Sequence, residues 1–257
     1  MSDYKQKVNT LNEILNVQQL SVFEHNRQLL HELSLQVVQG AFHCIIGESG
    51  SGKSLLTRTI LGMRRSNLAY QGMIDFDLTK ADAVFQDVQS NMFQNVRLEK
   101  HFQYLHEVSH SDLTWIEQKS EILTMMERLG LAQGEQLLKR YPFELSGGMA
   151  QRIAFIMSLI RRPDYLILDE PTSALDRDNN RKFMDYLSEV MRRRQMTVIF
   201  VTHDLNLVKA HATHISIVKD GNIIETGEAT RILEHPHHAY TEQLISIASR
   251  RQDYASS

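Results

Sequence analysis

The stretch that most constrains the fold is Gly47-Glu48-Ser49-Gly50-Ser51-Gly52-Lys53-Ser54. It follows the apolar run Ala41 to Ile46 and precedes the largely apolar run Leu55 to Leu61, so we expect a strand, a loop and a helix in that order. Glycines let backbone N–H groups curve around phosphate oxygens without a Cβ in the way, and the start of the following helix points its positive end at the same place. The stretch predicts a phosphate-binding loop (residues 47–54) rather than a glycine-rich turn with a stray lysine.

Two side chains at the end of this loop have chemistry that suits a bound nucleotide. The ammonium of Lys53 is expected to reach the β- and γ-phosphates as a point charge. The hydroxyl of Ser54 is expected to bind Mg²⁺.

Composition and charge agree with an α/β enzyme and exclude several other classes. The chain has 257 residues, and its 28 basic and 31 acidic side chains give a formal net charge of -3, which gives no reason to expect nucleic acid as a general partner. Cys44 is the only cysteine, so disulfide frameworks and thiolate metal sites are excluded. No run approaches the roughly 18 apolar residues of a membrane span, and Met1 to Thr10 is too polar for a signal peptide. We therefore expect the chain to be made and kept in the cytosol.

Changes of hydrophobic period divide the chain into an interrupted α/β core and a helical region. We expect one nucleotide-binding domain with its core at residues 12–87 and 163–244, a helical region at 88–162 and a C-terminal tail at 245–257. β-Type runs lie at residues 14–23, 41–46, 83–86, 165–169 and 197–201, and a hairpin is expected from 215–219 and 222–226. Strand, helix, strand units predict a mostly parallel sheet with ligands at the carboxyl ends of its strands.

Two adjacent carboxylates, Asp169 and Glu170, follow the β-type run Leu166 to Leu168. In a fold with a phosphate-binding loop, a strand of this kind lies beside the strand that leads into the loop, so Asp169 can hold Mg²⁺. Glu170 leaves the strand in another direction and can polarise an attacking water. The pair predicts hydrolysis, whereas an acidic pair taken alone is more often the start of a loop.

Six motifs in this order resemble those of the nucleotide-binding subunits of the ABC (ATP-binding cassette) transporter family, and the likeness covers about residues 15–244. They are the phosphate-binding loop, Val84-Phe85-Gln86-Asp87, Leu145-Ser146-Gly147-Gly148-Met149-Ala150-Gln151, Tyr165 to Asp176, Val201-Thr202-His203-Asp204 and Asp220 to Gly227. The resemblance implies an α/β P-loop NTPase with a mostly parallel core sheet, additional antiparallel strands and an inserted helical subdomain. It also implies hydrolysis of ATP with Mg²⁺.

Matching of these motifs assigns the remaining site residues. The resemblance implies catalytic functions for Lys53, Gln86, Glu170 and His203, and Mg²⁺ ligands at Ser54, Gln86 and Asp169. It further implies that Asp176 communicates across a dimer, and it makes Phe23 the candidate for stacking on adenine.

The resemblance also implies a head-to-tail dimer that traps two ATP molecules, and the LSGG motif (residues 145–148) supports this physically. Ser146 is a good N-cap for the helix expected at residues 149–160, while Gly147 and Gly148 bare its first backbone amides. A bare helix start is a second anion site, although the chain has one phosphate-binding loop. Its expected occupant is the γ-phosphate held by another subunit. Met149 stands where the family most often has glutamine.

The segment from Leu233 to Glu242, with His235-Pro236-His237-His238-Ala239-Tyr240-Thr241, is similar to a tail of the oligopeptide, dipeptide and nickel importer group of this family. The short chain and Met149 most resemble the nickel-type subunits. Because peptide-transporting members have the same histidines in this tail, we do not expect these histidines to bind nickel.

This reading implies a peripheral protein on the cytoplasmic face of a prokaryotic cell membrane. Its expected partners are a second ABC ATPase subunit, either a copy or a paralogue, two integral-membrane permease subunits and, indirectly, an extracytoplasmic substrate-binding protein, with no nucleic acid. Two alternatives stay open: the ATPase subunit of an exporter, and an ABC-type ATPase that acts on nucleic acid or ribosomes.

Overall fold

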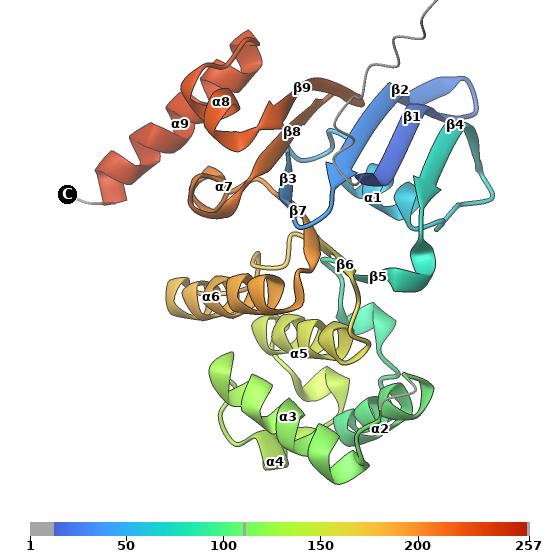
Figure 1. Cartoon of the computed structure of the whole chain (residues 1–257), viewed down its shortest axis with the longest axis vertical. Helices are drawn as coiled ribbons and strands as arrows, with labels where there is room; N and C mark the ends of the chain where they lie inside the picture. Colours follow the sequence, from blue (N-terminus) through green and yellow to red (C-terminus); the bar gives the residue numbers. More distant parts are fainter. Residues whose placement is uncertain (1–12, 110–111, 256–257) are drawn as a thin grey trace, which may run out of the picture. The chain divides into compact units, whose positions relative to one another are not determined.

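Two units interleave along the chain in the computed structural model, which describes residues 13–109 and 112–255 (Figure 1). One unit consists of Met1–Leu78 and His203–Ser257, and the other of Thr79–Thr202. The polar segment at residues 1–10, the predicted start of the core at residue 12 and the last residues of the predicted tail, 256–257, lie outside the described residues.

The first unit combines a three-stranded antiparallel sheet, β2-β1-β4, with a second group of strands and with helices. Its described elements are β1 (Glu13–Glu24), β2 (Arg27–Val38), β3 (Phe42–Ile46), α1 (Lys53–Ile60), β4 (Leu68–Phe76), α7 (Leu205–His211), β8 (His214–Lys219), β9 (Asn222–Glu228), α8 (Ala229–Glu234) and α9 (Ala239–Ala255). β3 pairs with β8 in parallel, and β8 pairs with β9 antiparallel. The unit therefore has both the parallel and the antiparallel strands that the sequence predicts.

β3 and the β8–β9 hairpin form as the sequence predicts. All five residues of β3 are buried: four are apolar, and the fifth is His43. The hairpin turns at Asp220 and Gly221, whose φ angles of 47° and 74° are both in the left-handed region that a two-residue turn of this kind requires.

Strands β2 and β4 were not predicted from the sequence. In β2 the buried residues Leu30 and Leu33 are three positions apart, because the chain makes an irregular step at Glu32, where φ is 43°. This step breaks the alternation that marks a half-buried strand. β4 has no fully buried residue, so it carries no apolar signal, and its pairing with β1 places it.

The second unit has a parallel sheet, β5-β6-β7, and a group of helices. Its described elements are β5 (Ala81–Val84), α2 (Leu98–Val108), α3 (Trp115–Arg128), α4 (Gly134–Leu138), α5 (Gly147–Ile160), β6 (Tyr165–Asp169), α6 (Arg177–Arg194) and β7 (Thr197–Thr202), with short 3-10 helices at Gln89–Asn91 and Pro142–Glu144. A further 3-10 helix, Leu78–Lys80, begins at the last residue of the first unit's N-terminal segment and ends in this unit. β5 pairs with β6, and β6 with β7, all in parallel. The predicted α/β fold is thereby confirmed in both units.

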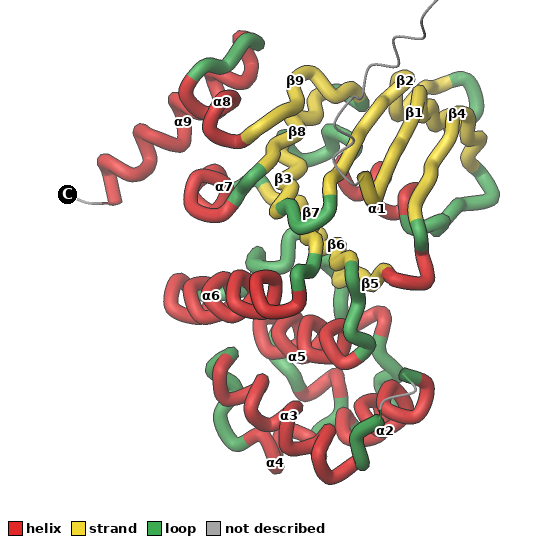
Figure 2. Tube along the Cα trace, in the orientation of Figure 1, coloured by secondary structure: helices red, strands yellow, loops and turns green. Residues whose placement is uncertain are grey.

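Helices occupy the stretch at 88–162 for which the sequence predicts helical spacing, and Figure 2 shows α2, α3, α4 and α5 grouped together. The rings of Phe155 in α5 and Phe183 in α6 are both buried, with centroids 4.5 Å apart. The predicted strand at residues 83–86 is wrong by two residues, because β5 ends at Val84, its last residue paired with β6. The apolar sequence continues into the buried Phe85, which extended the predicted strand.

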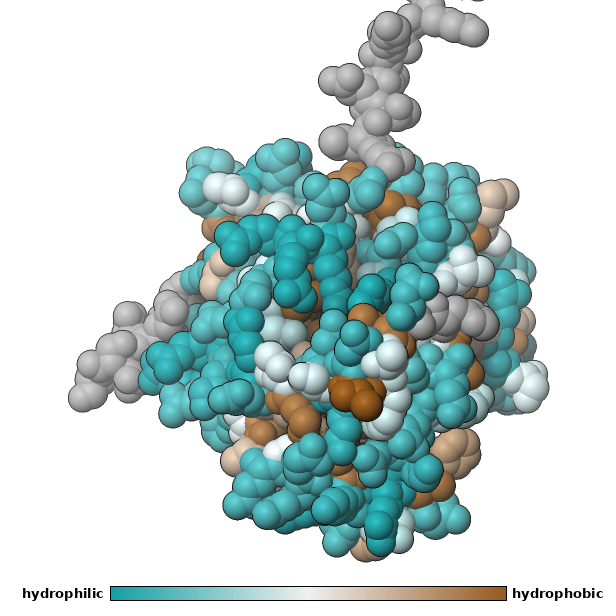
Figure 3. All heavy atoms as spheres, turned by 60° about the horizontal axis from the view of Figure 1, so that its bottom comes forward, coloured by the Kyte–Doolittle hydropathy of each residue, from teal (hydrophilic) through white to brown (hydrophobic). Residues whose placement is uncertain are grey.

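The face drawn in Figure 3 is mainly hydrophilic, and its hydrophobic atoms lie in small separate areas. Among the residues that the structure describes, no helix combines the length and the hydropathy needed to cross a membrane.

Candidate active site

The phosphate-binding loop curls tightly in the first unit, between β3 and α1. Gly50 and Gly52 have φ angles of 81° and 107°, a region that side-chain-bearing residues rarely adopt. At Gly47 a Cβ atom would lie 2.1 Å from the carbonyl oxygen of Val218 in β8. Glycine is therefore required at positions 50 and 52 by the backbone conformation, and at position 47 by the close approach of the neighbouring strand.

Lys53, the first residue of α1, folds back over the loop. Its Nζ donates hydrogen bonds to the carbonyl oxygens of Gly47 and Glu48, at 2.8 Å each, and the side chain is buried. Gly52, in the left-handed region, is the N-cap of α1, so no side chain covers the helix start. A buried ammonium beside a bare helix N-terminus is an arrangement that favours an anion.

The loop also has polar capacity that its own fold does not use. Ser51 Oγ is buried, and no hydrogen-bond partner for it lies among the described residues. A Cβ added at Gly47 would come within 2.8 Å of this oxygen, so the space beside it depends on the glycine. Ser54, the predicted Mg²⁺ ligand, is exposed in the first turn of α1. These residues fit a phosphate group with a divalent cation.

Asp169 is the last residue of strand β6 in the second unit, and Glu170 follows it directly. Asp169 is 2% exposed and pairs in register with Val201 of β7. Glu170 has a φ of 52° and donates its backbone N–H to the carbonyl oxygen of Val201, 3.0 Å away. The left-handed backbone turns the chain out of the strand, so that two adjacent carboxylates leave it at a bend, and strained backbone of this kind is often kept at functional sites.

The LSGG motif starts helix α5, as predicted. Ser146 is the N-cap, and its Oγ accepts the backbone N–H of Met149 at 3.3 Å. Ser146 and Gly147 are exposed. A Cβ at Gly148 would meet the carbonyl oxygen of Ala174 at 2.7 Å, so this glycine has a packing requirement that sequence reasoning missed. The exposed helix start is accessible to a group outside this unit.

Gln151 of α5 connects this helix to the segment that follows β6, a function that was not predicted from the sequence. Its Nε2 donates to the carbonyl oxygen of Glu170 at 3.4 Å and to Ser173 Oγ at 3.1 Å. The backbone N–H of Ala174 donates to its Oε1 at 3.3 Å. Within the second unit, the structure thereby brings the LSGG motif and the acidic pair together.

Gln86 lies two residues after β5, on an exposed turn of the second unit. Three residues later, the side-chain amide of Gln89 donates to the carbonyl oxygen of Leu145, at 3.1 Å. This hydrogen bond joins the segment that carries Gln86 to the start of the LSGG motif.

Asp176, His203 and Phe23 lie at or near the ends of secondary-structure elements. Asp176 is the N-cap of α6 and accepts the N–H of Asn179 at 2.9 Å, a hydrogen bond that lowers the pKa of its carboxyl. His203 is exposed, one residue after β7, and belongs to the first unit. Phe23 is half-buried on β1 and pairs with Gln28 of β2 and with Ala69 of β4.

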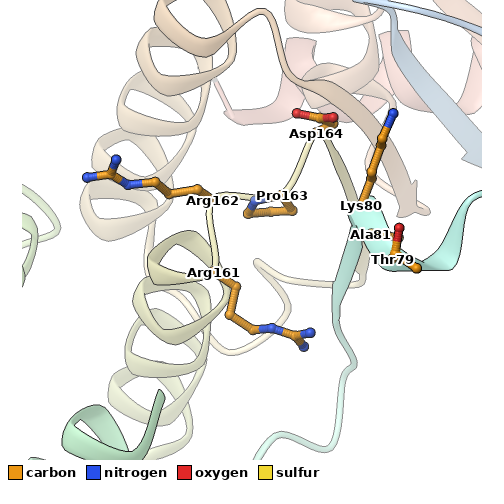
Figure 4. Close-up of a pocket in the computed structure, with 7 residues that line it drawn as sticks. All are labelled: Thr79, Lys80, Ala81, Arg161, Arg162, Pro163 and Asp164. Atoms are coloured by element: carbon orange, nitrogen blue, oxygen red, sulfur yellow. The ribbon is translucent and has the colours of Figure 1, made fainter. Parts of the chain in front are cut away.

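A cavity of about 140 Å³ lies at the other end of the strands of the second unit (Figure 4). It is lined by residues 79–81, which lead into β5, and 161–164, which precede β6. Its cations are directed apart: Arg161 pairs with Asp82 at 3.4 Å, and Figure 4 shows Arg162 pointing away from the other lining residues. The cavity is at the amino ends of the strands, whereas Asp169 is at a carboxyl end, so it is separate from the predicted chemistry.

Comparison with known proteins points to one family. Residues 30–173 match the family model described as "ABC transporter". The oligopeptide transport ATP-binding protein AmiE of Streptococcus pneumoniae is 34% identical over 239 residues, covering 86% of this chain and 67% of AmiE. The metal-staphylopine import system ATP-binding protein CntD of Staphylococcus aureus is 28% identical over 260 residues, covering 94% of this chain and 95% of CntD.

Solved structures agree on the fold. The dimeric ATP-binding cassette MJ0796, in a post-hydrolysis state bound to ADP and Pi, has a TM-score of 0.72 to this chain at 23% identity. The likeness covers 84% of this chain and 98% of MJ0796.

Proposed function

The chain belongs to the ABC transporter family, and from that premise we propose that it is the ATP-hydrolysing subunit of an importer of oligopeptides or metal complexes. It is an ATPase coupled to transport. The observation that carries the importer proposal is its similarity, over most of its length, to subunits named for oligopeptide transport and for metal-staphylopine import. Among metals we propose nickel, because the short chain and Met149 resemble nickel-type subunits.

We propose that the phosphate-binding loop holds the phosphates of ATP. Its backbone amides and Lys53 supply positive charge, and the buried Ser51 Oγ is a polar group that a phosphate oxygen can use. Ser54, Gln86 and Asp169 would hold Mg²⁺, which when bound neutralises phosphate charge. Phe23 is proposed to stack on adenine.

Glu170 is proposed to polarise the attacking water, and His203 to contact the γ-phosphate. Glu170 suits this function because its carboxylate adjoins the proposed Mg²⁺ ligand Asp169 at the bend after β6. The proton of the attacking water passes to a base during hydrolysis, and a carboxylate at this place supplies one.

The LSGG motif is proposed to complete the ATP site of a second cassette, with Asp176 communicating across that dimer. The exposed Ser146 and Gly147 at the start of α5 support this, because a helix start without bulky side chains can bind a phosphate group. The remaining proposed partners are two permease subunits and an extracytoplasmic binding protein, and the proposed location is the cytoplasmic face of the membrane. The proposed domain organisation is a single cassette with a helical subdomain at residues 88–162.

Uptake assays test the importer proposal. Cells with and without the gene would be supplied with labelled nickel, labelled cobalt and labelled short peptides. We expect loss of the gene to abolish uptake of one of these cargoes, and to do so equally when Lys53→Ala replaces the wild type. Unchanged uptake of all three contradicts the importer proposal and leaves the ATPase assignment intact.

A further inference from the structure

The tail segment at residues 235–241, hereafter the tail latch, is held to the β8–β9 hairpin by one carboxylate. Glu225 of β9 accepts the backbone N–H groups of His237 and His238, at 3.0 and 3.4 Å, and the hydroxyl of Thr241, at 2.6 Å. Glu225 is 8% exposed and Thr241 is fully buried. Burial alone would raise the pKa of Glu225, but these hydrogen bonds outweigh it and the pKa is lowered, so the carboxylate stays charged and bound.

The histidines of the tail latch serve this docking. His237 and His238 contribute backbone N–H groups, and His238 Nδ1 also accepts the N–H of Tyr240 at 3.0 Å, in the first turn of α9. The latch therefore presents two side chains to the rest of the first unit: Thr241 contacts Glu225, and Tyr240 contacts Glu48.

Tyr240 joins the tail latch to the phosphate-binding loop. Its hydroxyl oxygen accepts the backbone N–H of Glu48 at 3.3 Å, and the ring is 6% exposed. The Nζ of Lys219, at the end of β8, lies 4.6 Å from the centroid of the ring. Burial of the ring and the cation over its face thus hold the hydroxyl in place.

The N–H group that donates to the Tyr240 hydroxyl and the carbonyl group that accepts from Lys53 belong to the same peptide group. The peptide plane between Gly47 and Glu48 contains the Gly47 carbonyl, to which Lys53 Nζ donates at 2.8 Å. Because a peptide group is rigid and planar, a hydrogen bond at its N–H also fixes the direction of its carbonyl. Tyr240 therefore orients the group that holds the ammonium of the phosphate-binding loop.

From this geometry we propose that Tyr240 is a positioning residue of the nucleotide site, and that docking of the tail latch on Glu225 sets the affinity of the loop for ATP. The inference rests on the proposed function of the loop as the ATP site. Tyr240 does not touch the nucleotide in this proposal. It acts through the Gly47–Glu48 peptide and Lys53.

Removal of one hydroxyl tests the proposal, and the chain supplies a matched control. Tyr240→Phe keeps the ring and its contact with Lys219 but loses the bond to Glu48. In Tyr70 of β4, the hydroxyl likewise accepts a backbone N–H, that of Arg65 at 2.9 Å, and Arg64 lies over the ring at 5.2 Å. Tyr70→Phe thus removes the same kind of bond in the β2-β1-β4 sheet rather than in the tail latch.

Calorimetric titration of the full-length chain with ATP and Mg²⁺ gives the dissociation constant of each variant. We expect Tyr240→Phe to raise it about threefold to tenfold, as for one lost hydrogen bond, and to raise KM for ATP with kcat changed less than about twofold. Tyr70→Phe is expected to leave both unchanged. Equal dissociation constants for wild type and Tyr240→Phe would overturn the proposal, as would an equal rise in both variants.

A second pair of variants acts on the latch without touching Tyr240. Thr241→Val removes the hydroxyl that donates to Glu225, whereas Thr241→Ser keeps one. We expect weaker ATP binding in Thr241→Val and recovery of wild-type affinity in Thr241→Ser. Wild-type affinity in Thr241→Val would contradict the proposal that docking of the tail latch sets the affinity for ATP. A wild-type chain that binds no ATP at all would instead defeat the proposed ATP site itself, so the two failures are distinguishable.

Discussion

The imidazole Nε2 of His43 lies 2.8 Å from the hydroxyl oxygen of Ser216, and this pair connects the strand that leads into the phosphate-binding loop to its parallel neighbour. Ser216 Oγ in turn lies 2.8 Å from Thr226 Oγ1, so the contact extends to β9. His43 is 2% exposed, and its ring stacks on that of His214. Burial, with a smaller contribution from the charge of His214, lowers the pKa of His43 to about 3.

Acid is therefore expected to destabilise the first unit through His43. Between the pKa of an unfolded histidine, about 6.5, and the folded value of about 3, the unfolded chain binds a proton that the folded chain does not. The free energy of unfolding is therefore not reduced by His43 above about pH 6.5. Below that pH it falls by roughly 1.4 kcal/mol for each further pH unit. Urea unfolding at pH 7.5 and pH 5 measures this loss.

His43→Leu supplies the comparison for that measurement. It removes the titrating group, so its stability is expected to fall less between the two pH values, by a difference of about 2 kcal/mol. An identical acid dependence in both proteins would show that His43 does not cause the loss.

The two glycines of the LSGG motif are expected to respond differently to alanine. A Cβ at Gly148 would lie 2.7 Å from the Ala174 carbonyl oxygen, whereas one at Gly147 would make an ordinary contact with Ala174 Cβ at 3.4 Å. Gly148→Ala forces the backbone near Ala174 to move and is expected to cost about 1–3 kcal/mol of folding stability. Gly147→Ala is expected to cost less than about 0.5 kcal/mol. Thermal unfolding compares them, and equal melting temperatures would contradict the close approach.

Cys44 is expected to be inert in the folded protein. It lies in β3, is 0% exposed, and burial raises the pKa of its thiol well above the usual range. Only a thiolate reacts readily with disulfide reagents. Titration with such a reagent is expected to detect no reactive thiol in native buffer and one per chain in urea. Rapid reaction in native buffer would show that β3 opens.

The sequence predicted the elements whose signal is local. β6 matches its predicted bounds because Tyr165 to Leu168 is a continuous β-type run that stops at a charged residue. The N-cap at Ser146 was predicted for the same reason, since a cap and its helix are adjacent in sequence. β4 was missed because its place depends on pairing with β1, and its own residues are all partly or fully exposed.

In the candidate site, too, the local motifs could be predicted from the sequence and the contacts between distant segments could not. The phosphate-binding loop and the acidic pair could be predicted because the residues of each motif are adjacent in the sequence. The contact between Tyr240 and Glu48 joins residues 192 positions apart, and no local period signals it. The packing requirement at Gly148 is likewise set by Ala174, a residue of another segment.

Phosphate release by Glu170→Gln tests most directly that this chain is an ATPase with its base at the end of β6. Glutamine keeps the size of the side chain but accepts no proton, so we expect ATP binding close to that of the wild type and phosphate release slowed by about a hundredfold or more. ATP should then hold the variant as a dimer in size-exclusion chromatography. Phosphate release at the wild-type rate would contradict the assignment of Glu170, and no ATP binding in either protein would contradict the nucleotide site.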